Sequence, residues 1–319
     1  MTRPRVGIVG ARRAHQGLGP FVARELQAAG ADVVAFAGTS EDSIARAGAE
    51  LRALGIPEAR GHVGVEALLA REELEALAIL SPFETHADAL EVALAAGVHV
   101  LCEKPFLWAG ADTVRVTREI VDRFAARNLL LHENCQWPWA LPAFESLHPG
   151  ATAAPPQRFT MRLSPSSVGL TMLVDSLPHP LSLLQALTHD RPARIRETRF
   201  SARDPEAETL LASFVYECAG NGIQAEVELV GRSAPPREVW LALDGRRAQR
   251  LVHPADYSLV LADGEKQVAL PDPLTALVRD FVRALERRLA GAPAPRASEI
   301  VSRIESLCSL AEAFQAGAR

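Results

Sequence analysis

The stretch Gly97-Val98-His99-Val100-Leu101-Cys102-Glu103-Lys104-Pro105 decides the fold that we expect of this chain. Its short apolar run is typical of a strand that is buried on both faces of a parallel sheet. The proline fixes φ and ends the strand, directly after a carboxylate and an ammonium group. Ligands of open α/β sheets bind beyond the carboxyl ends of the strands, so the position of Lys104 favours a role in chemistry. An ion pair on the protein surface is the alternative for these two charges.

The chain has 319 residues, of which 48% are hydrophobic and 23% are charged, and its net charge is −5. This length predicts two domains with sizeable cores. The acidic balance argues against a nucleic-acid partner and against a membrane surface, and no apolar run reaches transmembrane length. We expect no signal peptide, since the N-terminus leads straight into a strand. The four cysteines lack metal or redox spacing, which indicates a cytoplasmic protein with reduced core thiols and no metal.

Residues 5–37 predict the strand-loop-helix-strand unit that opens a dinucleotide-binding domain. The loop after Gly10 lies at a helix N-terminus, where backbone N–H groups attract a pyrophosphate. Its glycine pattern is irregular, because Arg12 stands where the second glycine of Gly-x-Gly-x-x-Gly is usual, and a plain strand-to-helix turn is the alternative. The loop residues expected to bind the cofactor are Gly10, Arg12, Arg13, Gly17 and Leu18.

The end of the second strand predicts NADP in preference to NAD. NAD-binding domains usually place an acidic residue there, on the ribose hydroxyls, but this strand ends in Thr39 and Ser40. These small hydroxyl residues leave room for a 2′-phosphate and can donate hydrogen bonds to it, while the two loop arginines supply positive charge. NAD stays possible, because Glu41 or Asp42 could turn back to the ribose and the arginines could be solvated.

Strand and helix patterns alternate through the rest of the first half. Helical spacing extends over residues 43–54 and 86–96, and apolar strands over 77–80 and 129–133. This alternation predicts a Rossmann-type α/β domain with a doubly wound parallel sheet over residues 1–134.

Residues 135–319 predict an α+β substrate-binding and oligomerisation domain with a largely antiparallel open sheet. Three Asn-Gly or Asp-Gly dipeptides lie between alternating or apolar runs, which is a strong hairpin signal. Helical patterns over 273–289 and 298–316 close the chain. An open sheet exposes one face, so we expect a homodimer or homotetramer formed through this sheet. The dipeptides are Asn221-Gly222, Asp244-Gly245 and Asp263-Gly264.

Two motifs of the first half, Ser81-Pro82-x-x-Thr85-His86-Ala87 and the block from Ala96 to Pro105, resemble the signature of one enzyme family. This is the glucose–fructose oxidoreductase / inositol dehydrogenase / rhizopine-catabolism (Gfo/Idh/MocA) family. Asp175-Ser176-Leu177-Pro178-His179 is similar to the Asp-x-x-x-His pair in the second domain of that family. The resemblance implies that Lys104 lies between nicotinamide and substrate. It also implies that the cofactor is bordered by Ser81, Pro82, His86 and Glu103.

The resemblance implies reversible hydride transfer at a carbinol or carbonyl carbon of a sugar, polyol or related small metabolite. His179 would take the hydroxyl proton, Asp175 would orient that hydroxyl or Lys104, and Lys104 would stabilise negative charge on oxygen. The spacing of Asp175 and His179 puts both on one helix face. The neighbouring prolines either start that helix near Ser176 or kink it.

Gln136 and Trp137 are further candidates for the substrate site, beside Lys104 and His179. An indole offers apolar area with one hydrogen-bond donor, although packing between domains explains it equally well. Two other functions stay open, reduction of an imine on the same fold and a non-catalytic regulator that binds dinucleotide. The joint presence of Lys104, Asp175 and His179 argues against the regulator.

Overall fold

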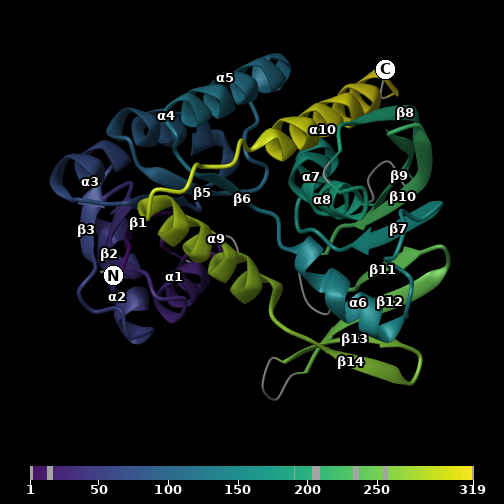
Figure 1. Ribbon diagram of the computed structural model, residues 1–319, viewed down its shortest axis with the longest axis horizontal. Coiled ribbons are helices and arrows are strands. Elements are labelled where there is room, and N and C mark those ends of the chain that lie inside the picture. Colours follow the sequence, from purple (N-terminus) through teal and green to yellow (C-terminus); the bar gives the residue numbers. More distant parts are fainter. Residues whose placement is uncertain are drawn as a thin grey trace. The chain divides into compact units, whose positions relative to one another are not determined.

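The computed structural model of the protein describes residues 3–12, 17–189, 191–202, 209–232, 237–253 and 258–317 (Figure 1). The chain divides into two compact units. Unit 1 comprises Met1–Asn134 and Leu274–Val301, and unit 2 comprises Cys135–Pro273 and Ser302–Arg319. Over the described ranges, no helix is both long and apolar enough to cross a membrane.

Unit 1 is built on a six-stranded parallel sheet with the strand order β3-β2-β1-β4-β5-β6. The chain moves outward from β1 to β3 and then returns to the other side of β1, so the strand order reverses between β1 and β4. Ligands of doubly wound sheets bind at such a reversal. The predicted parallel α/β sheet is therefore confirmed. The strands are β1 Arg5–Val9, β2 Asp32–Gly38, β3 Arg60–Val63, β4 Ala76–Ile79, β5 His99–Glu103 and β6 Leu131–Asn134.

The helices of unit 1 lie in the connections between these strands. Helix α1 packs against α2, whereas α3 packs against α4 and α4 against α5. Each buries one stripe of its surface; in α5 the buried stripe includes Thr117, Ile120 and Phe124, as expected of helices that cover a sheet. The helices are α1 Gly19–Ala28, α2 Glu41–Ala53, α3 Val65–Arg71, α4 His86–Ala96 and α5 Thr113–Ala126, and the short 3₁₀ turns are η1 Phe83–Thr85 and η2 Gly110–Asp112.

Helix α9, Pro273–Leu289, follows the second sheet in the chain but packs within unit 1. The Thr275 hydroxyl donates a hydrogen bond to the buried Glu25 carboxylate of α1 at 2.7 Å. The rings of Phe281 and His132 meet edge to face at 6.0 Å. The sequence analysis assigned everything after the sixth strand to the second domain. The structure differs because an apolar stripe shows that a helix is buried but not which core buries it.

Unit 2 is built on an eight-stranded sheet with the order β14-β13-β12-β11-β7-β10-β9-β8. Every pair is antiparallel except β7 with β10, so the predicted fold class is confirmed. All three predicted hairpins form. The β9–β10 turn, however, lies at Ala219-Gly220, both with positive φ, and Asn221-Gly222 begins β10. The strands are β7 Arg158–Leu163, β8 Ala193–Ala202, β9 Thr209–Cys218, β10 Asn221–Val230, β11 Val239–Leu243, β12 Arg246–Val252, β13 Leu259–Asp263 and β14 Lys266–Leu270.

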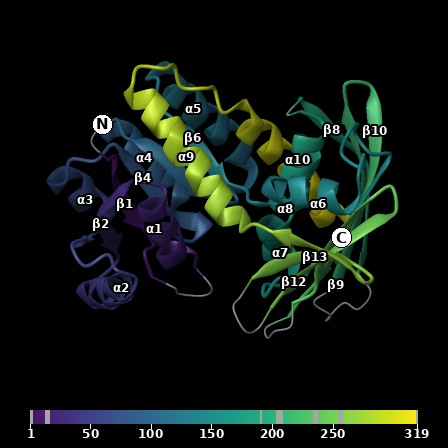
Figure 2. The same ribbon diagram turned by 60° about the horizontal axis from the view of Figure 1, so that its bottom comes forward.

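Helices cover one face of this sheet. Residues of β9 alternate between buried and half-buried, which is the pattern of a strand with one covered face. Figures 1 and 2 show α6, α8 and α10 on the same side of the strands. The other face carries the half-buried Arg162 and Trp240. The remaining elements are η3 Trp137–Ala140, α6 Leu141–Leu147, α7 Gly169–Ser176, α8 Pro178–Leu187 and α10 Ser298–Gly317.

Candidate active site

Two glycines shape the loop between β1 and α1. Gly10 has a φ of +82°, and a Cβ added there would lie 2.6 Å from the carbonyl group of Leu80. A Cβ on Gly19 would lie 2.1 Å from the Gly10 carbonyl oxygen. Backbone therefore packs directly on backbone at both positions, and only glycine fits. Gly19 was not among the predicted cofactor residues, which ended at Gly17 and Leu18.

The start of α1 suits an anion. Leu18 occupies the N-cap position and makes no side-chain hydrogen bond to the first turn of the helix, and Pro20 stands in that turn. The helix therefore presents backbone N–H groups that no described side chain caps. Gly17 directly precedes this N-terminus, and Arg12 lies half-buried at the other end of the loop. Arg13 lies outside the described residues.

The end of β2 carries hydroxyl groups. Thr39 and Ser40 are exposed. Ser40 caps α2, because its Oγ accepts a hydrogen bond from the Ser43 N–H at 3.2 Å and the Ser43 Oγ accepts one from the Ser40 N–H at 3.0 Å. Asp42 pairs with Arg46 at 2.6 Å, one turn along α2. The strand therefore ends without a carboxylate, and the carboxylate of Asp42 is engaged on the helix.

The turn after β4 is closed by its own side chains. The hydroxyls of Ser81 and Thr85 lie 2.7 Å apart, and the Thr85 hydroxyl donates to the Pro82 carbonyl at 2.8 Å. Thr85 stands at the N-cap position of α4 but makes no side-chain bond to the first turn of that helix. Pro82 is exposed and Ser81 half-buried at this turn.

His86 links this turn to the segment after β5. Its side chain is fully buried, with 0% of the residue exposed. Nε2 lies 2.9 Å from the Ser81 carbonyl oxygen, and Nδ1 lies 3.1 Å and 3.2 Å from the carbonyl oxygens of Pro105 and Phe106. Burial lowers the pKa of the imidazole, although these carbonyls act in the opposite direction. The sequence analysis expected His86 to bind the cofactor; because both ring nitrogens are engaged inside the protein, His86 instead holds two backbone segments together.

The segment after β5 is held from β6 as well. The Asn134 amide donates a hydrogen bond to the Glu103 carboxylate at 2.6 Å, and the Glu133 carboxylate accepts one from the Phe106 N–H at 2.8 Å. The half-buried Lys104 lies between these two anchors along the chain. The sequence analysis did not select Asn134 or Glu133, although two polar residues that end an apolar strand are a signal of this kind.

Cys102 lies under this segment as a neutral thiol. Its sulfur is 3.5 Å from Nδ1 of His86 and 3.8 Å from the Phe106 carbonyl oxygen. Burial raises the pKa of the thiol well above its usual value, and the negative charges of Glu133 and Glu103 raise it further. Cys102 is therefore a packing residue and no nucleophile.

In unit 2, a helix boundary separates the two acid/base candidates. Helix α7 ends at Ser176 and α8 begins at Pro178, while Leu177 between them keeps α-helical dihedral angles. The helix that carries His179 thus starts at the prolines, close to the predicted start near Ser176. Asp175 and His179 are both half-buried, and their spacing across this helical junction places them on one side of it.

Trp137 packs against His179. The two rings meet edge to face, with centroids 6.5 Å apart and planes at 70°. Trp137 is buried, and the half-buried Gln136 precedes it. The guanidinium carbon of Arg250 lies 5.3 Å from the same indole ring. The sequence analysis did not select Arg250, because β12 carries several arginines and nothing local distinguishes this one.

Of the predicted residues, Lys104 belongs to unit 1, and Gln136, Trp137, Asp175 and His179 belong to unit 2. The predicted residues are thus divided between the two units. In the described part of the chain, no three His, Cys, Asp or Glu side chains are arranged to hold a metal ion.

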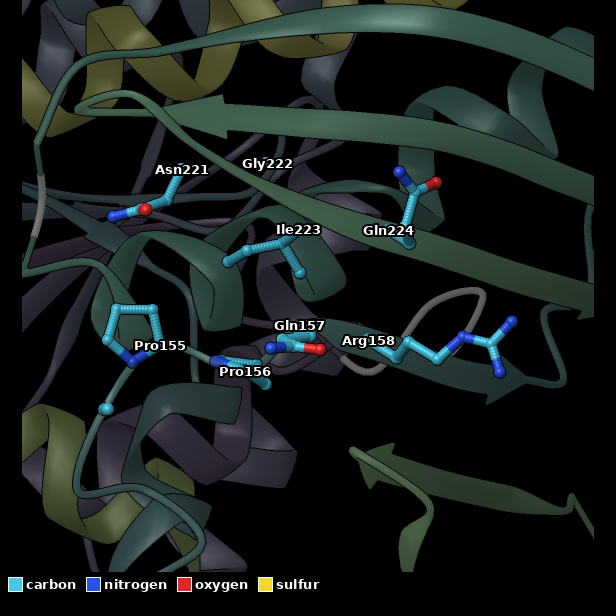
Figure 3. A pocket seen from close by; sticks show the side chains of 9 residues that line it. Pro155, Pro156, Gln157, Arg158, Asn221, Gly222, Ile223 and Gln224 are labelled. Atoms are coloured by element: carbon cyan, nitrogen blue, oxygen red, sulfur yellow. The ribbon is translucent and has the colours of Figure 1, made fainter.

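A cavity of about 670 Å³ in unit 2 lies apart from these residues. Its lining leads from Pro155 and Gln157 into Arg158 of β7 and includes Asn221 and Gln224 of β10 (Figure 3). None of the predicted site residues contributes to it. The cavity is therefore not the predicted active site.

Residues 4–134 match the sequence model of a family described as an oxidoreductase family with an NAD-binding Rossmann fold. Residues 4–134 carry the NAD-binding domain of the Gfo/Idh/MocA oxidoreductase family. The resemblance carried by the Ser81 and Glu103 motifs is therefore confirmed, and unit 1 contains the NAD-binding domain of that family.

Two relatives of this chain are named as dehydrogenases. It is 30% identical over 218 residues to UDP-N-acetylglucosamine 3-dehydrogenase of Acidithiobacillus ferrooxidans, a match that covers 66% of this chain and 63% of that protein. It is 46% identical over 72 residues to D-xylose 1-dehydrogenase (NADP(+)) 2 of Haloferax volcanii, which covers 23% of this chain and 22% of that protein. The matches thus span less than two thirds of the length of these relatives.

The fold of the whole chain is similar to that of a solved structure. This structure is the UDP-N-acetylglucosamine 3-dehydrogenase GnnA from Acidithiobacillus ferrooxidans, which aligns with a TM-score of 0.72 and 24% identity over 100% of both chains. At this identity the likeness shows the fold, including the second sheet that the family model does not reach.

Proposed function

We propose that this chain is an NAD(P)-dependent dehydrogenase that favours NADP. It would transfer hydride reversibly at a carbinol or carbonyl carbon of a sugar, polyol or related small metabolite. The observation that carries the proposal is the segment after β5, which is anchored by His86, Glu133 and Asn134 and presents Lys104 at the carboxyl end of an NAD-binding sheet. The names of the two curated relatives, both dehydrogenases of sugars, support the substrate class.

The nucleotide would lie at the reversal of strand order beside β1. The uncapped start of α1 suits its pyrophosphate, and the hydroxyl of the exposed Thr39 and the charge of Arg12 would suit a 2′-phosphate. When bound, the nicotinamide accepts or returns the hydride. A relative named for NADP(+) supports this preference. The residues proposed to contact the cofactor are Gly10, Arg12, Gly17, Leu18, Thr39, Ser40, Ser81, Pro82, Glu103 and Lys104.

The proposed catalytic residues are Lys104 of unit 1 and Asp175 and His179 of unit 2. The Lys104 ammonium would hold the reacting hydroxyl and stabilise negative charge on its oxygen. The His179 imidazole would take the hydroxyl proton as hydride leaves, and Asp175 would orient the hydroxyl or Lys104. Gln136 and Trp137 would line the substrate site beside His179.

The test is turnover of a panel of sugars, polyols and imines, followed by the absorbance of reduced nicotinamide. Replacing a group that transfers or stabilises a proton typically lowers the rate by about 10²–10⁴-fold. We therefore expect a loss of this size in Lys104→Ala and in His179→Ala, whereas Lys266→Ala on the exposed β14 keeps the wild-type rate. Unchanged turnover in Lys104→Ala would refute the assignment, and cofactor binding without any turnover would favour a regulator.

The protein would work in the cytoplasm as a homodimer or homotetramer formed through the open face of the second sheet. Four free, buried cysteines suit a reducing compartment. On the open face, Arg247 stacks on Trp240 at 4.3 Å, and Arg162 lies 3.4 Å from Glu228. This mixture of an aromatic ring and paired charges is typical of interfaces between subunits.

A further inference from the structure

Arg250 places a positive charge on the helix-covered face of the second sheet. In the strand register its direct neighbours are Val239 of β11 and Leu261 of β13. Residues directly opposite one another share a face of the sheet, and these two are buried, with 5% and 0% of the residue exposed. The Arg250 side chain therefore projects from this face of the sheet between two apolar residues.

The guanidinium of Arg250 and the imidazole of His179 lie against one indole. The Arg250 carbon is 5.3 Å from the Trp137 ring centroid, and the His179 ring meets that indole edge to face at 6.5 Å. At this distance the positive charge is attracted to the face of the indole ring. A charge at this position is therefore held next to the proposed proton acceptor.

The protein itself offers Arg250 little to bind. Over the described ranges, no carboxylate lies within ion-pair distance of its nitrogens, and Asp272 is the negative charge that acts on it electrostatically. Burial lowers the pKa of the guanidinium, and Asp272 opposes that shift. Arg250 is half-buried. Its guanidinium donors are therefore available to an anionic ligand that reaches this face of the sheet.

Arg247, three residues earlier on the same strand, also lies over a tryptophan but has a carboxylate partner. It stacks on Trp240 at 4.3 Å and pairs with the Glu238 carboxylate at 3.3 Å on the open face of the sheet. Both arginines therefore lie over a tryptophan, but the protein supplies a carboxylate only to Arg247.

We propose that Arg250, which lies against the Trp137 indole, is an oxyanion-recognition subsite for a carboxylate or phosphate group carried by the substrate. The planar fork of arginine donates two parallel hydrogen bonds to either group. The inference rests on the proposed function and narrows it, because the substrate becomes an acidic sugar or a sugar phosphate ester. The negative group is bound beside the indole while the reacting carbinol reaches His179.

Calorimetric titration of the full chain with matched sugars tests the subsite. D-Glucose is the neutral probe, D-glucuronate carries a carboxylate, and D-glucose 6-phosphate and UDP-glucose carry phosphate. A hydrogen-bonded charge pair of this kind changes affinity by about 10- to 100-fold. We expect wild type to bind at least one anionic probe more tightly than glucose by that factor, and the probe that binds best distinguishes carboxylate from phosphate.

Three variants distinguish loss of the subsite from a general loss of positive charge and from misfolding. Arg250→Gln loses the preference for the anion, Arg250→Lys keeps a part of it because the charge remains without the fork, and Arg247→Gln keeps all of it. Equal binding of glucose and the anionic probes by wild type, no binding of any anion, or the same loss in Arg247→Gln overturns the subsite. Circular dichroism verifies that each variant is folded.

Turnover of the same probes keeps the two proposals distinguishable. If anions bind through Arg250 but no probe is oxidised, the proposed function fails and the subsite stands. If neutral sugars are oxidised as well as anionic ones and Arg250→Gln changes neither rate, the subsite fails and the proposed function stands.

Discussion

Lysine is rare in this chain, which gives the residue at position 104 particular weight. Of its 34 lysine and arginine residues only Lys104 and Lys266 are lysine. Arginine is the default basic residue here, but its guanidinium is broad and keeps its proton at every accessible pH. A compact ammonium group fits where a cation must touch one reacting oxygen, and this argues for chemistry at Lys104 beyond its place at a strand end.

At the residue scale, Thr39 sets the expected cofactor preference. A carboxylate at this exposed end of β2 repels a 2′-phosphate and accepts hydrogen bonds from ribose hydroxyls instead. In Thr39→Asp we expect the ratio of kcat/KM for NADP to that for NAD to fall at least about 10-fold, a typical cost of a like-charge contact. Thr39→Asn is the neutral control of the same shape. Faster turnover of wild type with NAD than with NADP at equal concentration contradicts the predicted preference.

At the scale of elements, the turn after β4 and the segment after β5 behave as one piece because His86 bonds to both. Its ring lies within hydrogen-bond distance of one carbonyl oxygen of the turn and two of the segment, and the neutral imidazole donates its single N–H to one of these two sides. Glu133 of β6 binds the same segment at the Phe106 N–H. The position of Lys104 therefore depends on side chains that need not touch cofactor or substrate.

Replacing His86 tests this linkage. His86→Ala removes the N–H that serves a buried carbonyl, which costs about 1–3 kcal/mol of unfolding free energy. We expect turnover to fall and Lys104 to react faster with an amine-modifying reagent, with exposed Lys266 as the internal reference in peptide mass spectrometry. Cys102→Ala, which removes the neighbouring sulfur, is the control. Unchanged Lys104 labelling and kcat in a folded His86→Ala protein show that the linkage does not position the lysine.

His99, at the start of β5, predicts a loss of stability in acid. Its Nδ1 accepts a hydrogen bond from the Leu130 N–H at 2.9 Å, and burial together with the charge of Arg288 lowers its pKa to about 4. The unfolded chain titrates near the ordinary histidine value of about 6.5. As pH falls between these values, the unfolded state binds a proton that the folded state does not, so stability decreases by up to about 3 kcal/mol.

Denaturant unfolding of wild type and His99→Asn over this pH range measures the effect. The asparagine side chain keeps a hydrogen-bond acceptor and does not titrate. We expect the midpoint to fall less steeply with decreasing pH in His99→Asn than in wild type. Parallel curves for the two proteins mean that other groups cause the acid sensitivity.

At the scale of the whole molecule, the open face of the second sheet predicts self-association. Trp240 lies half-buried there beneath Arg247, next to paired charges. We expect solution scattering to give the mass of two chains or more, and Trp240→Glu to lower it, because a buried unpaired carboxylate disfavours an interface. Lys266→Glu, on the exposed β14, is a control that adds negative charge. A monomeric mass for wild type contradicts the prediction.

The sequence was sufficient where the signals are local. The alternation of strand and helix patterns predicted the parallel sheet, and the Asn-Gly and Asp-Gly dipeptides predicted the hairpins of the second sheet. The motifs around Ser81 and Lys104 predicted the family. The remaining features depend on tertiary contacts, which local sequence patterns do not encode. The register of β12 with its neighbours, which places Arg250 against apolar residues, is a tertiary property. A histidine such as His86 can bind either a cofactor phosphate or backbone carbonyls with the same side chain. Only its packing in the fold shows which of these two roles it has.

The return of α9 to the first unit has a consequence for synthesis of the chain on the ribosome. Helix α9 supplies Phe281 and Thr275 to the first unit, and the chain enters that unit a second time at Leu274. The nucleotide-binding half, although encoded first, completes its packing only after the whole second sheet has been translated. The first unit therefore cannot reach its final packing before the second sheet has been translated.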